Sequence, residues 1–124
     1  MELNTFFFDT YAFYEIIKGN SNYRPYSKGI AIITTKLNLM ELYYGLLSNY
    51  GIETAEKHFQ RFSKFCVEFT DENIKNAMQF KAKNKEKKLS YIDCIGYIIA
   101  IEKNIPFLTG DKQFKLLGNV EFVK

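Results

Sequence analysis

Cysteine and histidine are scarce in this chain, which narrows the chemistry that it can carry. The two cysteines, Cys66 and Cys94, lie too far apart for a CxxC metal or redox motif. We expect no structural disulfide and expect both side chains to be buried. The single histidine, His58, lies in the charged stretch AEKHFQRF without a plausible serine or cysteine partner nearby. A catalytic triad therefore has little support, and His58 is expected at the surface.

Long apolar runs and a strong net charge are also absent. The longest apolar stretches, such as YIIAI, are far shorter than the roughly 20 residues that span a bilayer. The first residues, MELNTFFFDT, have neither the basic start nor the cleavage site of a signal peptide. We therefore expect a cytoplasmic protein without membrane association. The formal net charge of +3 is compatible with a polyanionic partner but does not identify one.

The composition that remains is that of a globular protein. Hydrophobic residues make up 47% of the chain and charged residues 25%. The length fits one domain, residues 1–124, that buries a core without disulfides or a structural metal. The sequence contains no repeat, linker or low-complexity segment that would divide this domain.

Apolar runs typical of strands alternate with segments of helical periodicity. Strands are predicted at 6–8, 30–35, 66–69, 105–110 and 120–123. Helices are predicted at 11–19, 36–51, 53–64, 71–88 and 91–104, with a short helical turn at 111–117. This alternation predicts an α/β fold with a mostly parallel sheet and helices on both faces. Ligands of such a fold bind at the carboxyl edge of the sheet.

Four acidic residues stand where a strand is followed by a helix, or on that helix. They are Asp9 in FFFDTYAF, Glu41 in NLMELYYG, Asp93 in LSYIDCIG and Asp111 in FLTGDKQF. Because the carboxyl ends of parallel strands share one edge, these side chains can converge on a single crevice. Such a crevice would bind a divalent metal.

Helix capping offers another explanation for three of these acids. Asp9 and Asp111 stand at positions where aspartate commonly caps a helix, and Ser90 with Asp93 forms a capping-box pattern. Glu41 is different, because it lies inside a helix among apolar neighbours that predict a largely buried side chain. Helical spacing places it on a polar stripe with Thr34, Asn38, Gly45 and Ser48.

Crowding these carboxylates together is unfavourable without a countercharge. Two carboxylates about 4 Å apart repel each other by roughly 4 kcal/mol at an effective dielectric constant near 20. Coordination to Mg²⁺ or Mn²⁺ relieves this repulsion, and ligands that are all oxygen favour these ions over zinc.

Five lysines in KAKNKEKK supply a concentrated positive charge: Lys81, Lys83, Lys85, Lys87 and Lys88. A basic rim beside an acidic crevice suits a phosphodiester backbone held over metal ions. Lysines at the end of a helix also complement its dipole and are commonly just solvated. Both interpretations remain open at this point, as do phosphate contacts by Arg24 and base stacking by Tyr11 or Tyr91.

The four acids in these settings resemble the PIN-domain ribonucleases over essentially the whole chain. FDTYA is similar to the first motif of the family, NLMELYYG to the second, LSYIDCIGYIIA to the third and FLTGDKQF to the fourth. No single motif is specific, but their order and spacing match. The small size is most like the VapC-type toxins of toxin–antitoxin pairs. The chain departs from the common toxin pattern at Asn38, where threonine or serine is usual, and at Cys94, where alanine is usual.

The resemblance implies a five-stranded parallel sheet and a metal-dependent endoribonuclease that uses Mg²⁺ or Mn²⁺. It implies single-stranded or looped RNA as substrate, with 5′-phosphate and 3′-hydroxyl products. The implied catalytic metal ligands are Asp9, Glu41, Asp93 and Asp111, and the implied water- or phosphate-binding neighbours are Thr10, Ser90, Thr109 and Lys112.

Partners and competing functions are less constrained by the sequence. An antitoxin and a second copy of the chain are both expected partners, because the helix from Leu39 to Tyr50 has more apolar faces than one sheet can cover. A fully buried core helix is the other explanation. The competing functions are an RNA-processing or decay nuclease without an antitoxin, and an inactive RNA-binding or assembly module.

Overall fold

A sheet of four parallel strands, in the order β2-β1-β3-β4, forms the centre of the molecule. The computed structural model describes residues 4–124. The strands are β1 (Thr5–Phe8), β2 (Ala31–Ile33), β3 (Phe107–Thr109) and β4 (Val120–Phe122). The predicted α/β class with a parallel sheet is therefore confirmed. The expected fifth strand is not found among these residues.

The segment 66–69, predicted as a strand, pairs with the sheet at one residue only. Cys66 forms an isolated parallel bridge with Thr34. The Thr34 N–H donates to the Phe65 carbonyl at 3.0 Å, and the Val67 N–H donates to the Thr34 carbonyl at 2.9 Å. The pairing stops there because the chain turns into a helix at Lys36, directly after β2. The prediction of a strand at 66–69, and of five strands, was wrong.

Helices follow the predicted pattern, with shorter ends. They are α1 (Thr10–Lys18), α2 (Lys36–Tyr50), α3 (Ile52–Phe62), α4 (Asp71–Lys83) and α5 (Tyr91–Glu102), with the 3₁₀ turns η1 (Ser21–Tyr26), η2 (Ser63–Phe65) and η3 (Lys112–Phe114). The predicted helix at 71–88 is too long, because the Asn84 amide donates to the Phe80 carbonyl at 2.8 Å and ends α4. Only part of the lysine cluster is therefore helical.

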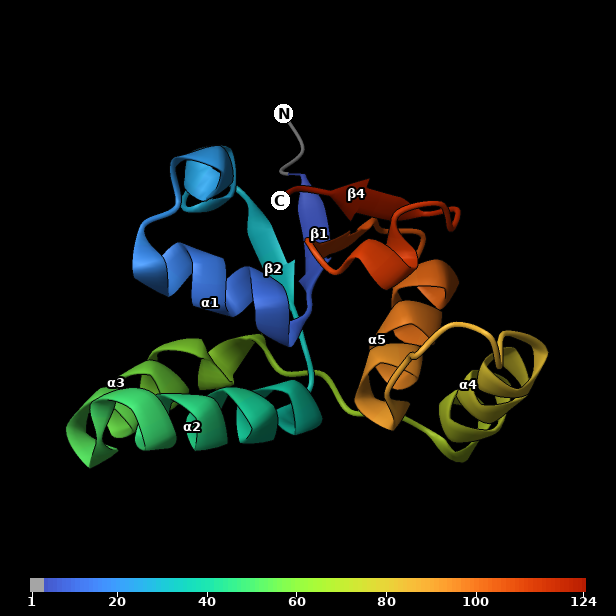
Figure 1. Cartoon of the computed structure of the whole chain (residues 1–124), viewed down its shortest axis with the longest axis horizontal. Helices are drawn as coiled ribbons and strands as arrows, with labels where there is room; N and C mark the ends of the chain where they lie inside the picture. Colours follow the sequence, from blue (N-terminus) through green and yellow to red (C-terminus); the bar gives the residue numbers. More distant parts are fainter. Residues whose placement is uncertain (1–3) are drawn as a thin grey trace.

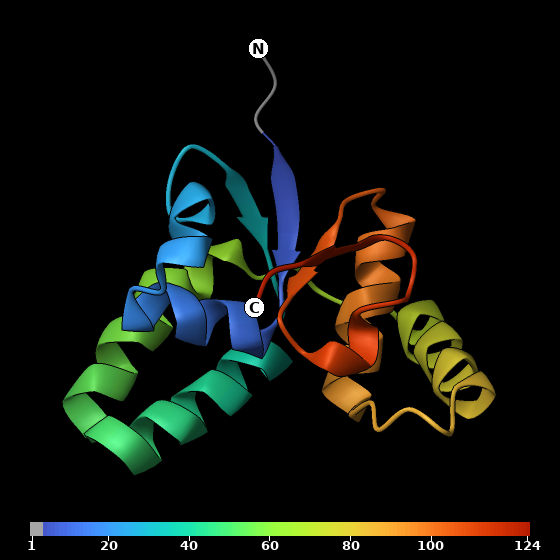
Figure 2. The ribbon, with the colours of Figure 1, turned by 45° about the horizontal axis from the view of Figure 1, so that its top comes forward.

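The alternation of side chains along β1 separates two hydrophobic cores. Phe6 and Phe8 pack with α1, α2 and α3 on one face of the sheet. Phe7 points to the other face and packs with α4, α5 and η3. Figures 1 and 2 show these two groups of helices on opposite sides of the strands. Gly96 lets α5 approach β1, since a Cβ atom there would lie 2.7 Å from the Phe7 ring. Side chains of β1 thus anchor the helices on both faces of the sheet.

The two cysteines and the single histidine are only partly where we expected them. Cys94 is buried, Cys66 is half-buried, and both are free thiols. His58 is 8% exposed, so the expectation of a surface histidine was wrong. Its ring stacks on Phe62, one helical turn further along α3, with 6.1 Å between the ring centroids. None of the helices in the described residues has the length and apolar composition to cross a membrane.

Candidate active site

An open cleft of about 540 Å³ lies at the carboxyl edge of the sheet. All four predicted carboxylates line it, and the complete lining is Asp9, Thr10, Tyr11, Glu41, Asp93, Gly110, Asp111, Lys112 and Lys124. The side chains come from the ends of β1 and β3, from α1, α2, α5 and η3, and from the segment after β4. The sheet edge therefore gathers residues from most of the chain, as the strand and helix pattern predicted.

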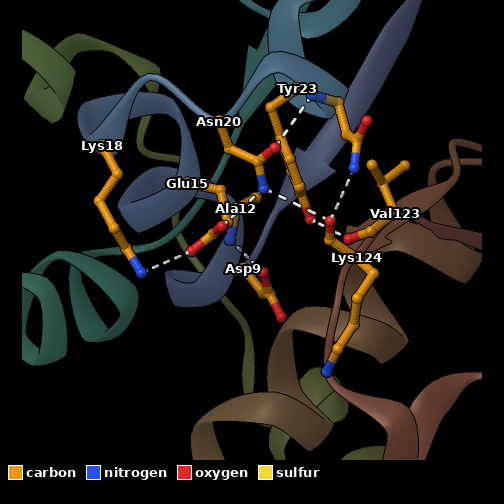
Figure 3. A network of polar contacts seen from close by, with 9 residues as sticks. Asp9, Ala12, Glu15, Lys18, Asn20, Tyr23, Val123 and Lys124 are labelled. Carbon is orange, nitrogen blue, oxygen red and sulfur yellow. Dashed lines mark hydrogen bonds and ion pairs between the residues drawn. The ribbon is translucent and has the colours of Figure 1, made fainter.

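Asp9 both caps a helix and lines the cleft. It follows β1 directly, and its Oδ1 accepts a hydrogen bond of 2.8 Å from the Ala12 N–H at the start of α1 (Figure 3). The side chain is only 2% exposed. The pKa of Asp9 is raised from 3.8 to about 8, mainly by burial; hydrogen bonds from Thr109 and Ala12 oppose this rise, and the charges of Asp93 and Asp111 add to it. The site therefore disfavours the negative charge that Asp9 would carry in water.

Asp93 occupies the third position of α5 and closes the predicted capping box. The Asp93 N–H donates to Ser90 Oγ at 3.0 Å, and the Ser90 N–H donates to Asp93 Oδ2 at 3.1 Å. Burial raises the pKa of Asp93, hydrogen bonds from Ser90 lower it, and the nearby Glu41 and Asp111 raise it. Ser90 thus orients Asp93 and stabilises its ionised form.

Asp111 is joined to Asp9 through Thr109. The Asp111 N–H donates to Thr109 Oγ1 at 3.0 Å, and the Thr109 side chain is also hydrogen-bonded to Asp9. Asp111 Oδ1 accepts from the Gln113 N–H at 2.9 Å, which caps η3. Lys112 is exposed at the mouth of the cleft. The predicted neighbours Thr109 and Lys112 are therefore both at this site.

Glu41 is half-buried rather than largely buried, because its side of α2 faces the open cleft. The Thr10 hydroxyl donates to Glu41 Oε1 at 2.7 Å. The Asn38 amide lies 3.4 Å from Thr10 Oγ1, and the Thr35 hydroxyl donates to Asn38 Oδ1 at 2.7 Å. This chain of polar groups, from Thr35 through Asn38 and Thr10 to Glu41, fixes the carboxylate. Of the predicted polar stripe, Asn38 and Glu41 belong to the site, and Ser48 is solvent-exposed.

The donor set of this cleft fits Mg²⁺ or Mn²⁺. Every acidic group in the lining is a carboxylate, with hydroxyl oxygens beside them, and such hard oxygen ligands are those that these ions prefer. A divalent ion would also favour the ionised form of Asp9, whose pKa is raised mainly by burial and in smaller part by the charges of Asp93 and Asp111. No three His, Cys, Asp or Glu side chains within residues 4–124 are already arranged as a metal site. The carboxylates therefore share the cleft without forming a preassembled cage.

Sequence patterns missed three residues of the lining or gave them no definite role. Gly110 and Lys124 were not predicted, and Tyr11 was considered only for base stacking. The position of Gly110 between β3 and η3 was a signal for its place at the sheet edge, but nothing in the sequence indicates that Lys124 lies at the site. In the part of the chain that the structure describes, the lysine cluster does not line this cleft. Lys81, Lys85 and Lys87 line a separate hollow beside α4.

Comparison with known structures supports the fold assignment. VapC20 from Mycobacterium tuberculosis, described as a sarcin–ricin loop cleaving toxin, is similar with a TM-score of 0.80 and 20% identity over 96% of this chain and 99% of that one. A toxin–antitoxin complex from Klebsiella pneumoniae gives a TM-score of 0.73 and 16% identity, over 93% of this chain and 94% of that one. VapBC2 from Rickettsia felis, bound to a DNA fragment from its promoter, gives a TM-score of 0.70 and 20% identity, over 97% of this chain and 99% of that one.

Family membership is established by the sequence itself. No curated protein sequence gives a significant match. The sequence model described as "PIN domain" matches residues 6–120, a region that includes all four carboxylates of the cleft. The resemblance inferred from the four motifs is therefore confirmed, and the chain belongs to the PIN-domain family, with VapC toxins among its structural neighbours.

Proposed function

We propose that the protein is a Mg²⁺- or Mn²⁺-dependent endoribonuclease and the toxin of a toxin–antitoxin pair. The observation that carries the proposal is the meeting of Asp9, Glu41, Asp93 and Asp111 in one cleft of a PIN domain. Within residues 4–124, Lys18 and Glu15 form the only ion pair, so none of these four acids is ion-paired with a side chain there. Helix capping uses one oxygen each of Asp9, Asp93 and Asp111, but it does not account for Glu41 or for the gathering of four carboxyl groups without an ion-pair partner in one open cleft.

The four acidic residues divide two parts of the proposed reaction between them. Asp9, Asp93 and Glu41 would hold the divalent ion, and the Thr10 hydroxyl fixes Glu41 for this purpose. The bound ion supplies Lewis-acid chemistry, lowering the pKa of water and offsetting negative charge on the scissile phosphate. Asp111 Oδ1 is held by the Gln113 N–H, which leaves Oδ2 to orient the attacking water. In-line attack then yields a 5′-phosphate and a 3′-hydroxyl, without a protein nucleophile.

The proposed substrate is single-stranded or looped RNA. The cleft is open to solvent at the sheet edge, so an unpaired strand can reach the carboxylates without a closing lid. The fold neighbour VapC20 is described as a toxin that cleaves the sarcin–ricin loop. This chain shares 20% of its sequence with that toxin, so the target of its own cleavage is a separate question.

The proposed protein partner is an antitoxin. The helix α2 is not a buried core helix, because large apolar side chains remain exposed on it and at the start of α3: Met40, Tyr44, Leu47, Tyr50 and Ile52. Solvent-exposed apolar side chains gathered on one pair of helices mark a contact surface. A second copy of this chain would compete for the same surface, and an RNA-processing nuclease without an antitoxin would have no need of it.

Cleavage of cellular RNA tests the proposed activity directly. Purified protein would be incubated with total RNA and Mn²⁺ or Mg²⁺, and new 5′-phosphate ends would be sequenced. We expect discrete ends that EDTA abolishes and that Asp93→Asn reduces by at least about 100-fold, since a metal ligand is lost. Asp71→Asn is the matched control, because Asp71 is an exposed aspartate in the first turn of α4. Undiminished cleavage by Asp93→Asn would overturn the site assignment.

The hydrogen bond from Thr10 to Glu41 leads to a second prediction, on the role of the Thr10 hydroxyl. Thr10→Val removes the hydroxyl that donates to Glu41 Oε1 at 2.7 Å but keeps the shape of the side chain. Loss of such an orienting partner typically reduces the activity of a metal site by about 10–100-fold. We expect a loss of about tenfold in kcat with little change in melting temperature. Thr10→Ser, which retains the hydroxyl, should remain close to wild type; equal losses in both variants would contradict this role.

A further inference from the structure

We propose that Lys124 binds a backbone phosphate of the RNA in the active-site cleft. This inference rests on the proposed nuclease function in one respect, namely that RNA is the polyanion bound there. Lys124 follows β4 and lines the same cleft as the four carboxylates, and only Lys112 provides another cationic side chain in that lining. Phosphate contacts of this kind position a nucleic acid strand without reading its sequence.

The pairing of β3 with β4 brings Lys124 to the site. The Val123 N–H donates to the Thr109 carbonyl at 2.9 Å, so the segment after β4 runs beside the end of β3 that precedes Asp111. A cation at this position lies where a strand entering the cleft meets four carboxyl groups. It offsets the repulsion between the ionised ones and the RNA backbone next to the proposed metal-binding residues.

Polar side chains from η1 and its N-terminal cap hold the backbone of this segment. The Tyr23 hydroxyl donates to the Val123 carbonyl at 2.6 Å, and the Asn20 and Asn22 amides donate to the Lys124 carbonyl at 3.4 and 3.3 Å (Figure 3). Tyr23 is fully buried, and Asn20 also donates to Glu15 Oε1 at 2.7 Å. The main chain at Lys124 is therefore fixed to the body of the protein, while its side chain is exposed.

The Lys124 ammonium has no competing partner among the described residues. It forms no ion pair there, although four carboxylates line the same cleft. It lies 6.0 Å from the centroid of the Tyr11 ring, at the outer limit of a cation–π contact. Its three N–H donors are thus available to phosphate oxygens. Figure 3 shows its side chain extending past Asp9 rather than toward the residues of η1.

Salt-dependent RNA binding tests this role separately from cleavage. The probe is a fluorescein-labelled single-stranded RNA of mixed sequence, measured by anisotropy with Mg²⁺ in an Asp93→Asn background. Removing one phosphate contact lowers the slope of log K against log salt by about 0.7 for a single strand. Adding Lys124→Gln should lower the slope by that amount and weaken binding about fivefold at about 0.1 M salt. Lys124→Arg, which keeps the charge, should retain the slope.

Lys103→Gln is the matched control, because Lys103 is exposed at the opposite end of α5 from Asp93. Its slope and affinity should equal those of the Asp93→Asn background. An unchanged slope in Lys124→Gln, an equal loss in Lys103→Gln, or the absence of any RNA binding would overturn the proposal. Failure of the cleavage assay together with the expected slope change would instead reject the nuclease function and leave the phosphate contact standing.

Discussion

Asp9→Asn is expected to abolish RNA cleavage and, in the absence of divalent metal, to raise the free energy of unfolding. Asp9 is buried, and its pKa is raised from 3.8 to about 8. Because the folded-state pKa is the higher one, the favourable contribution of the protonated carboxyl is complete below about pH 3.8 and is lost as the pH rises toward about 8. Asparagine carries no charge, and its amide oxygen can still accept from the Ala12 N–H as a helix cap.

The stability difference should be large at neutral pH and small in acid. Each pKa unit corresponds to about 1.4 kcal/mol, so the penalty for Asp9 at pH 7 is on the order of 4 kcal/mol. Urea unfolding in EDTA at several pH values measures it as the gap between variant and wild type. The gap should close as the pH falls toward about 4. Asp71→Asn, at an exposed position, should show no comparable gap.

Metal addition should reverse the order of stability. A divalent ion that binds the folded wild-type protein raises its melting temperature by mass action, and the loss of Asp9 removes one of the proposed ligands. We therefore expect Mn²⁺ to stabilise the wild type clearly and Asp9→Asn little. An Asp9→Asn protein that is less stable than the wild type in EDTA would contradict the electrostatic account of the cleft.

The acidic site was predictable because its signals are local. Asp9, Asp93 and Asp111 each follow an apolar strand or a serine cap, and strand topology alone brings such positions to one edge. Glu41 was identifiable because it stands inside α2, where capping does not explain it. The fold class followed from the same alternation of strands and helices. The extent of elements was less predictable, since a strand at 66–69 needed a longer partner strand and the chain instead enters α2 at Lys36.

Residues whose positions depend on distant contacts were not predictable. Lys124 reaches the cleft because η1 holds the Val123 and Lys124 carbonyls, and those partners lie about a hundred positions earlier in the chain. His58 is buried because its face of α3 packs with Phe62, although charged residues such as Lys57 and Arg61 stand near it in the sequence. Local composition describes neither contact. The same limit applies to the lysine cluster. Its charge suggested a basic rim, but among the described residues these lysines do not line the cleft.

Gly110→Ala is expected both to destabilise the protein and to impair the site. Gly110 has no positive φ, so its importance lies in space rather than in backbone conformation. An added Cβ would lie 2.2 Å from Tyr11 Cε1 and 2.5 Å from the Val123 carbonyl oxygen. The Tyr11 ring can rotate away, but that oxygen is held by the Tyr23 hydroxyl at 2.6 Å. The segment after β4 must therefore shift.

The size of this effect follows from overpacking against a fixed backbone. We expect the free energy of unfolding to fall by about 1–3 kcal/mol. Cleavage should fall by about tenfold, because Asp111 is adjacent and a misplaced group in a catalytic site is costly to the rate. Gly118→Ala is the matched control, since a Cβ there meets nothing within 4 Å and the residue has no positive φ. If the two variants unfold at the same urea concentration and cleave equally well, the close approach of the Val123 carbonyl to Gly110 does not shape the active site.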